Sequence, residues 1–163
     1  MPTLFEFPIT INGDEGLKES MHSALLPHEV FHTIYHEAPL LFRKLFTGGE
    51  ENLQRWWSGA EKLNDHWYRQ HPVIQKVKDP RLRVPIGLHG DDAGAHGLQQ
   101  VLVLTWGSVA VDLPTLDSRL VFCMIRVADI VKDDADSTLQ TIYKVHWSCM
   151  AHSKQATANN KQH

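Results

Sequence analysis

Two unbroken apolar runs in the second half of the chain have the length and composition of buried strands. They cover residues 101–106 and 120–125, and each is bounded by turn residues. A third strand is predicted before them, where the apolar residues Val84, Ile86 and Leu88 alternate with Arg83, Pro85 and Gly87. Continuous apolar runs are typical of strands buried on both faces, so we expect helices on both sides of this sheet. The short links between the strands predict an antiparallel meander.

The first half of the chain has the three- and four-residue apolar spacing of helices. One helix is predicted to begin at Pro27, because a missing N–H costs nothing in the first turn. It should end before Pro39, since the residue preceding a proline avoids the helical region. A second helix is predicted over residues 40–46, with its end at Gly48.

Two longer helical patterns follow. The first covers residues 50–70, and we interpret its tryptophans as core residues rather than as a platform for stacked bases. The second covers residues 136–151 and would pack against the sheet. Its apolar stripe consists of Leu139, Ile142, Tyr143, His146 and Met150.

The N-terminal residues 3–11 predict an extended segment, which Pro8 restricts to the edge of a sheet. The predicted fold class is therefore α/β (α+β), a small three-stranded, mainly antiparallel sheet flanked by helices. With 163 residues the chain is long enough for one domain with a core. Its expected parts are an extended segment over 1–20, helices over 21–80, three strands and a helix over 81–151, and a polar tail over 152–163.

Composition narrows the class of protein. Apolar residues make up 42% of the chain, which is typical of a globular protein. The formal net charge of −3 argues against a surface that attracts nucleic acid everywhere. Cys123 and Cys149 lie among apolar residues and are interpreted as buried thiols of a reducing compartment. Without a signal sequence or a membrane-spanning run, we expect an intracellular protein, cytoplasmic or nuclear, with no membrane partner.

A family resemblance is carried by two segments. IGLHGDDAG at 86–94, followed by VLVLTWGSVAVDLPTLDSRLVFCMIR at 101–126, resembles the opening of the ribonuclease-H-like core of DDE-type, cut-and-paste transposases. With LPHEVFHTIYH at 26–36 and HPV at 71–73, the chain also resembles a large repeated family of mobile-element-derived proteins in unicellular algae. The likeness covers roughly residues 25–151, and its motifs are short.

The resemblance implies that Asp91 matches the first catalytic carboxylate of the transposases. Their chemistry uses two metal ions, Mg or Mn, held by three carboxylates. The second carboxylate would follow a fourth strand, which is not visible here, so we expect a non-catalytic remnant. It could retain a metal contact through His89 and Asp91, or associate with DNA or with a chain that completes the sheet. The residues alone favour a different reading, a turn aspartate in a glycine-rich loop.

A locally basic stretch precedes the first of the three strands. It is a candidate for contact with nucleic acid, although a solvated linker is the simpler interpretation. Its four basic residues are Lys76, Lys78, Arg81 and Arg83.

A competing site lies on the helix that begins at Pro27. His28, Glu29 and His32 match the pattern HExxH of zinc metallohydrolases, in which the glutamate acts as the base. His36 extends the row of histidines by one turn. The row lies opposite the apolar stripe of the helix, however, so a solvent-exposed row that acquires zinc or nickel adventitiously is the alternative to catalysis.

Overall fold

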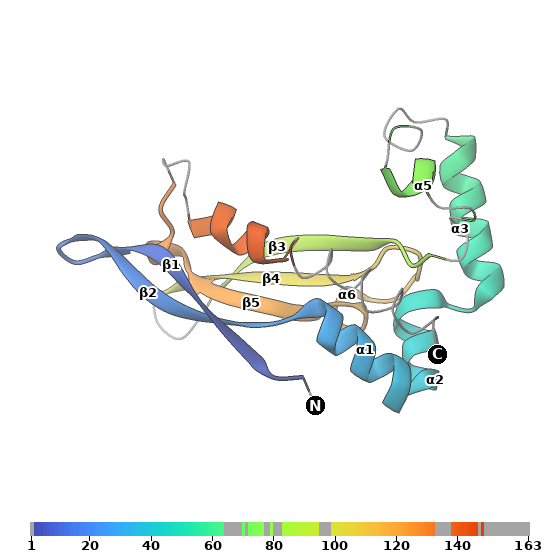
Figure 1. The fold of residues 1–163 in the computed structure, drawn as a ribbon, viewed down its shortest axis with the longest axis horizontal. Coiled ribbons are helices and arrows are strands. Elements are labelled where there is room, and N and C mark those ends of the chain that lie inside the picture. Colours follow the sequence, from blue (N-terminus) through green and yellow to red (C-terminus); the bar gives the residue numbers. More distant parts are fainter. Residues whose placement is uncertain are drawn as a thin grey trace. The chain divides into compact units, whose positions relative to one another are not determined.

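The computed structural model describes residues 2–63, 70, 72–76, 79, 83–94, 99–132, 138–146 and 148. It is a mixed α+β structure with a three-stranded antiparallel sheet, a two-stranded sheet and helices (Figure 1). The predicted fold class is confirmed. The chain divides into two compact units, each formed from separate segments. The first unit comprises Met1–His36, His89–Thr105 and Val121–His163, and the second comprises Glu37–Leu88 and Trp106–Leu120.

The three-stranded sheet has the predicted meander order. Its strands are β3 (Ile86–Gly94), β4 (Gln100–Ser108) and β5 (Leu120–Arg126), with β4 in the centre. The expectation that both faces of the apolar runs are buried is wrong for β5, where Val121 is 40% and Met124 57% exposed. An antiparallel sheet can bury one face and leave part of the other in solvent.

Strand β3 is longer than its alternating pattern predicts. The predicted glycine-rich loop after Leu88 is extended chain as far as Gly94. Pairing with β4 accounts for this, because a Cβ built on Gly90 would lie 3.0 Å from the Leu104 side chain. Pro85 stands just before the strand, at the position where an edge strand tolerates proline.

The two-stranded sheet is a hairpin in the first unit. Strand β1 (Leu4–Gly13) pairs with β2 (Gly16–Leu25) along its whole length, and Gly16 takes a positive φ of 120° at the turn. The prediction of an extended N-terminal segment is confirmed for β1. The prediction of helix from residue 21 is wrong for residues 21–25, which belong to β2.

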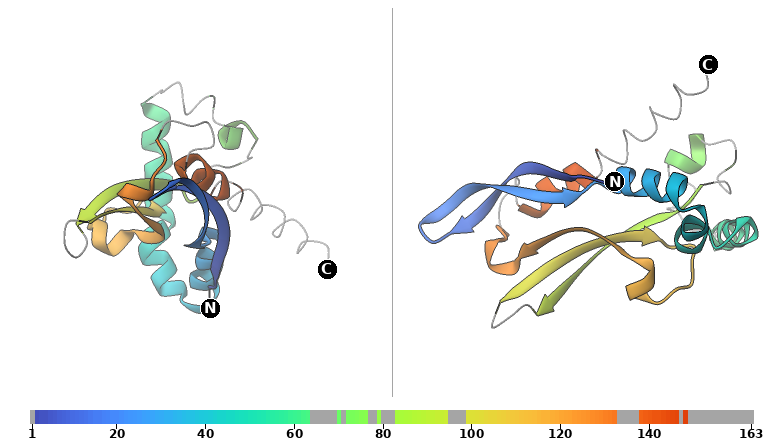
Figure 2. Two further views of the ribbon diagram at one scale, coloured as in Figure 1. Left: turned by 90° about the vertical axis from the view of Figure 1, so that its left-hand side faces the viewer. Right: turned by 90° about the horizontal axis from the view of Figure 1, so that it is seen from below.

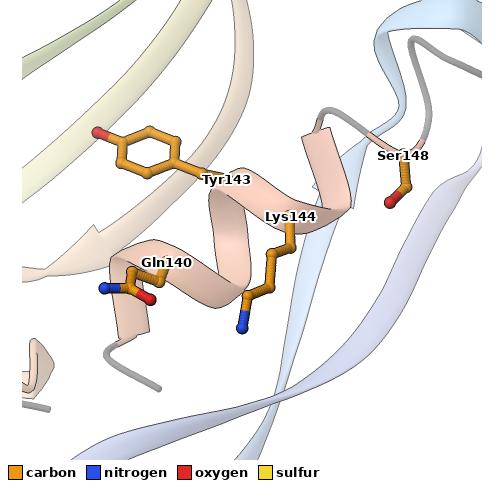
Figure 3. Close-up of a pocket in the computed structure, with 4 residues that line it drawn as sticks. All are labelled: Gln140, Tyr143, Lys144 and Ser148. Carbon is orange, nitrogen blue, oxygen red and sulfur yellow. The ribbon is translucent and has the colours of Figure 1, made fainter. Parts of the chain in front are cut away.

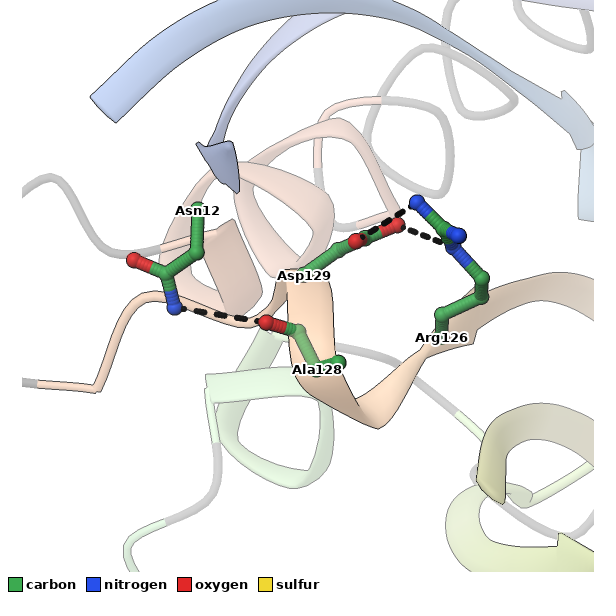
Figure 4. Close-up of polar contacts among 4 residues, drawn as sticks. All are labelled: Asn12, Arg126, Ala128 and Asp129. Carbon is green, nitrogen blue, oxygen red and sulfur yellow. Dashed lines mark hydrogen bonds and ion pairs between the residues drawn. The ribbon is translucent and has the colours of Figure 1, made fainter. Parts of the chain in front are cut away.

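Hydrogen bonds attach the hairpin to later parts of the first unit. The Asn12 side-chain amide donates to the carbonyls of Ile130 at 2.9 Å and Ala128 at 3.5 Å, the second of which is drawn in Figure 4. The Thr138 hydroxyl accepts from Val131 N and donates to Thr10 O. The residues 138–146 are helical and lie beside the hairpin (Figure 2). These contacts let β1 bury one face.

The short helical turn η3 (Val127–Asp129) follows β5 directly and carries an ion pair of its own. Arg126 donates from Nε and one terminal nitrogen to the two carboxylate oxygens of Asp129, at 2.7 and 2.8 Å (Figure 4). The pair raises the pKa of the Arg126 guanidinium through this hydrogen bond and through its charge.

The N-terminal helices begin and end close to the predicted residues. Helix α1 (Pro27–Glu37) starts at the proline and stops before Pro39. Helix α2 (Pro39–Phe42) continues as the π-helix η1 (Arg43–Thr47) and ends at Gly48, whose φ of 62° is the left-handed conformation of a C-cap. Helix α3 (Glu50–Lys62) is continuous through Gly59, and residues 64–69 of the predicted helix lie outside the described residues.

The second unit has an aromatic core. Phe46 stacks on Trp106 with ring centroids 5.6 Å apart, and both side chains are almost fully buried. Trp57 is buried as well, and its indole N–H donates to the carbonyl of Arg83 at 2.8 Å. Asn52 joins α3 to the end of β4 by donating to the Ala110 carbonyl at 2.7 Å. The interpretation of Trp57 as a core residue is confirmed.

The remaining described helices are short. They are α5 (Pro72–Lys76) and α6 (Thr115–Ser118), and neither reaches two turns. The predicted helix over 136–151 is observed at 138–146, where Ile142 and His146 are buried. Its predicted stripe residue Tyr143 is 37% exposed instead. No helix within the described residues has the length and apolarity to cross a bilayer.

Candidate functional sites

The candidate metal residues His89 and Asp91 lie on the exposed half of β3. Both side chains are exposed, as is Asp92, and strand alternation places His89 and Asp91 on one face and Asp92 on the other. Asp91 does not stand at the end of a strand, because β3 continues to Gly94. The turn interpretation is wrong for the same reason.

A two-metal phosphodiester site needs several carboxylates around one point. Within the described parts of the chain, no group of three His, Cys, Asp or Glu side chains is placed to hold a metal ion. Asp91 therefore has no pair of acidic partners among those residues. Among the described residues, the predicted Mg or Mn site near His89 and Asp91 lacks the convergence of carboxylates that two-metal chemistry requires.

Within the described parts of the chain, the outer edge of β3 presents backbone groups without a strand partner. Val109 N donates to the Pro85 carbonyl at 3.0 Å, and the Thr105 hydroxyl donates to the His89 carbonyl at 3.4 Å. Since an antiparallel strand alternates the direction of its hydrogen bonds, the odd-numbered residues of β3 face β4. No described strand pairs with the opposite edge. The residues whose N–H and C=O are directed there are Ile86, Leu88, Gly90, Asp92 and Gly94.

The basic stretch is only partly described. Lys76 is exposed at the last residue of α5, and Arg83 is exposed while its carbonyl accepts the hydrogen bond from Trp57. Lys78 and Arg81 lie outside the described residues. A patch made of all four side chains stays a prediction.

The HExxH residues on α1 do not face a common point. The Glu29 carboxylate accepts hydrogen bonds from the backbone N–H and the hydroxyl of Thr3, both at 3.2 Å, so it is engaged by the N-terminal strand segment. His28 is half-buried, whereas His32 is exposed. The close pair is His32 with His36, whose ring centroids are 4.3 Å apart. The structure thus brings together a different pair from the one that a zinc hydrolase would use.

Two histidines, the buried His146 and the half-buried His22, have perturbed pKa values. His146 packs edge-to-face on Phe122 at 5.1 Å, and His22 packs in the same way on Phe7 at 5.8 Å. Burial lowers the pKa of both imidazoles, because the charged form loses its hydration. His146 was recognisable from its place on the apolar stripe of its helix. His22 lies in β2, where the local pattern gave no signal.

Cys123 and a depression on the last helix offer no reactive group. Burial raises the pKa of the Cys123 thiol to about 12, in agreement with the interpretation of an inert buried cysteine. The depression in Figure 3 is lined by one helix and carries neither a carboxylate nor an imidazole. Its residues are Gln140, Tyr143, Lys144 and Ser148.

Comparisons with protein-family models, with curated proteins and with solved structures give no match. The resemblance to transposase cores therefore rests on the sequence segments at 86–94 and 101–126 alone.

Proposed function

We propose that the protein is a non-catalytic remnant of a mobile-element, transposase-like protein that acts as a binding module. Its open β3 edge receives an extended strand from a partner chain. The observation that carries this proposal is the edge of the nine-residue strand β3 that no described strand covers, along which residues 89–94 are exposed. The meander of β3, β4 and β5 is the arrangement that the resemblance implies for the beginning of a ribonuclease-H-like core.

A free edge strand binds by completing its hydrogen-bond ladder. The unpaired N–H and C=O groups of an edge are a template for another strand, and main-chain bonds supply the affinity in this mode of recognition. Along β3 these groups recur at every second residue from Ile86 to Gly94. Gly90 and Gly94 have no side chain beyond a hydrogen, so the backbone of an incoming strand can approach closely there.

The charge of β3 specifies the partner. The strand contains Asp91 and Asp92 and neither Lys nor Arg. Like charges opposite each other destabilise a strand pair, so a second copy of β3 would be a poor partner. A strand with Lys or Arg opposite the two aspartates would be a good one. Phosphate groups would meet the same two carboxylates, which disfavours DNA at this edge.

The proposal is tested with a library of displayed peptides selected on the folded protein. We expect enriched peptides to combine β-forming residues with Lys or Arg. Asp92→Pro should abolish their binding and preserve the fold, because the N–H that it removes points away from β4. Asp92→Ala keeps that N–H, so it should retain binding with a weaker preference for basic peptides.

Asp91→Pro is the matched control, since it removes an N–H directed at β4 and should disturb the sheet itself. Equal peptide binding by wild type and Asp92→Pro, with both folded, would overturn the proposal. So would a library that yields no binder. Magnesium- or manganese-dependent nicking of DNA that disappears in Asp91→Asn would show that the protein is a nuclease rather than a binding module.

A further inference from the structure

The exposed surface of α1 carries a second feature, which is independent of the β3 edge. His32 and His36 lie one helical turn apart, both side chains are exposed, and their ring centroids are 4.3 Å apart with an interplanar angle of 55°. Tyr35 packs edge-on against His36 at 4.9 Å and 90°. The contact restricts the imidazole of His36 on the side facing Tyr35. Two imidazoles thus stand together on a helical scaffold.

This spacing matches the needs of one metal ion. Side chains at positions i and i+4 of a helix are neighbours on one face, so two imidazoles can each direct a nitrogen to the same point. The metal–nitrogen distance is about 2.0–2.1 Å for zinc, so two imidazoles that bind one ion must lie close together, as these two rings do. Imidazole nitrogens favour zinc, copper and nickel over magnesium and calcium, which prefer oxygen ligands.

The first two residues of the HExxH pattern, His28 and Glu29, have different surroundings from the exposed pair. Glu29 accepts two hydrogen bonds from Thr3, and the Nδ1 atom of His28 is buried without a hydrogen-bond partner among the described residues. His28 is therefore oriented by packing, whereas His32 and His36 face solvent. The three-ligand cluster of a zinc hydrolase is not formed within the described residues, and a two-ligand chelate needs only the exposed pair.

We propose that His32 and His36 form a bidentate site for a divalent transition-metal ion, of the class copper, nickel or zinc. The ion binds to two imidazole nitrogens on the surface of α1, and water fills its remaining coordination positions. No hydrolysis is assigned to it, since the only carboxylate in the HExxH pattern is directed to Thr3. The site also clamps the last turn of α1, because both ligands must keep the helical spacing while the metal is bound.

The test uses the full chain, isotopically labelled, with Cu²⁺ added in small steps. The paramagnetic ion should broaden the amide signals around His32 and His36 before the others. His32→Ala and His36→Ala should each weaken binding on the order of tenfold, because the second ligand no longer binds intramolecularly. His28→Ala, one turn earlier on the same row, is the matched control and should leave the affinity at α1 unchanged. Mg²⁺ should neither broaden these amide signals nor displace the bound Cu²⁺.

Three results would overturn the site. The first is broadening that starts elsewhere in the chain and leaves α1 signals sharp. The second is an affinity at α1 that survives His36→Ala. The third is loss of binding in His28→Ala with retention in His36→Ala, which would assign the metal to the HExxH pair. If a variant is less stable, the positions of its unaffected amide signals show whether α1 is still folded.

Discussion

The two edges of the three-stranded sheet contrast sharply. Strand β5 buries Phe122, Cys123 and Ile125, and its aromatic ring packs on His146. Strand β3 is exposed at every residue from 89 to 94. Both strands flank the same central strand β4. One edge strand is therefore part of the core of the first unit, and the other presents its backbone and its two aspartates to solvent.

The difference teaches that strand formation and burial have separate causes. Strand β3 persists through Gly90 and Gly94 because β4 supplies hydrogen-bond partners, although few apolar groups cover it. Strand β5 is stabilised in addition by what packs on Phe122. We expect substitutions at the two edges to act on different properties, stability at β5 and recognition at β3.

The largest effect should come from Phe122→Ala in β5. The ring is 1% exposed, and truncating a buried Phe costs about 3–5 kcal/mol of unfolding free energy. Urea unfolding followed by circular dichroism measures this. Asp92→Ala on β3 should change the stability by less than about 0.5 kcal/mol, since it is an exposed surface position. Similar losses of unfolding free energy in the two variants would contradict the proposed difference between β5 and β3.

A smaller effect should appear as the pH is lowered, through His146 beside β5. Its pKa is lowered by burial from the ordinary 6.5, so the unfolded chain binds a proton more readily than the folded one. Stability that is fully present above pH 6.5 is thus lost as the pH falls below 6.5 and through the lower folded pKa. Melting temperatures measured from pH 8 to pH 5 should fall less steeply in His146→Gln than in wild type.

His22 contributes in the same direction, because burial lowers its pKa too. The double variant with His22→Gln should flatten the pH profile further. A wild-type melting temperature that rises on acidification would contradict the burial of both imidazoles.

The smallest change is the labelling of a single thiol. It compares the protection of a residue in β5 with that of a residue in β3. Because burial raises the pKa of the Cys123 thiol to about 12, its thiolate fraction at neutral pH is far below that of an ordinary cysteine. In a Cys149→Ser background, a disulfide reagent should leave Cys123 unmodified under native conditions. An added Ala93→Cys on β3 should react at once. Rapid native labelling at Cys123 would show that β5 is less protected than its burial indicates.

The helix ends and the meander could be predicted because local chemistry determines them. Pro27 opens α1, Gly48 closes η1, and the apolar run of β5 identifies that strand. Strand β2 could not be predicted, since most of its residues are polar or exposed and its conformation depends on pairing with β1. The extension of β3 past Leu88 was missed for the same reason, because cross-strand pairing overrides the local preference of Gly90 for turns.

The candidate sites were predictable as residues and less so as geometry. The sequence indicates that His28, His32 and His36 share a helical stripe, and it cannot show that Glu29 is held by Thr3, 26 residues earlier in the chain. Likewise, it predicts a strand as far as Leu88 and cannot show that this strand continues past Asp91 to Gly94. In both cases the missing information lies in contacts between distant segments.

The hydroxyl of Thr138 has a consequence for how the protein is made. It joins Thr10 and Val131, so the N-terminal hairpin completes its contacts only with a residue translated 128 positions later. On the ribosome, the nascent hairpin therefore cannot form this hydrogen bond until residue 138 has been synthesised. The pairing of β1 with β2 needs only the first 25 residues, so it can precede the contact with Thr138 during synthesis.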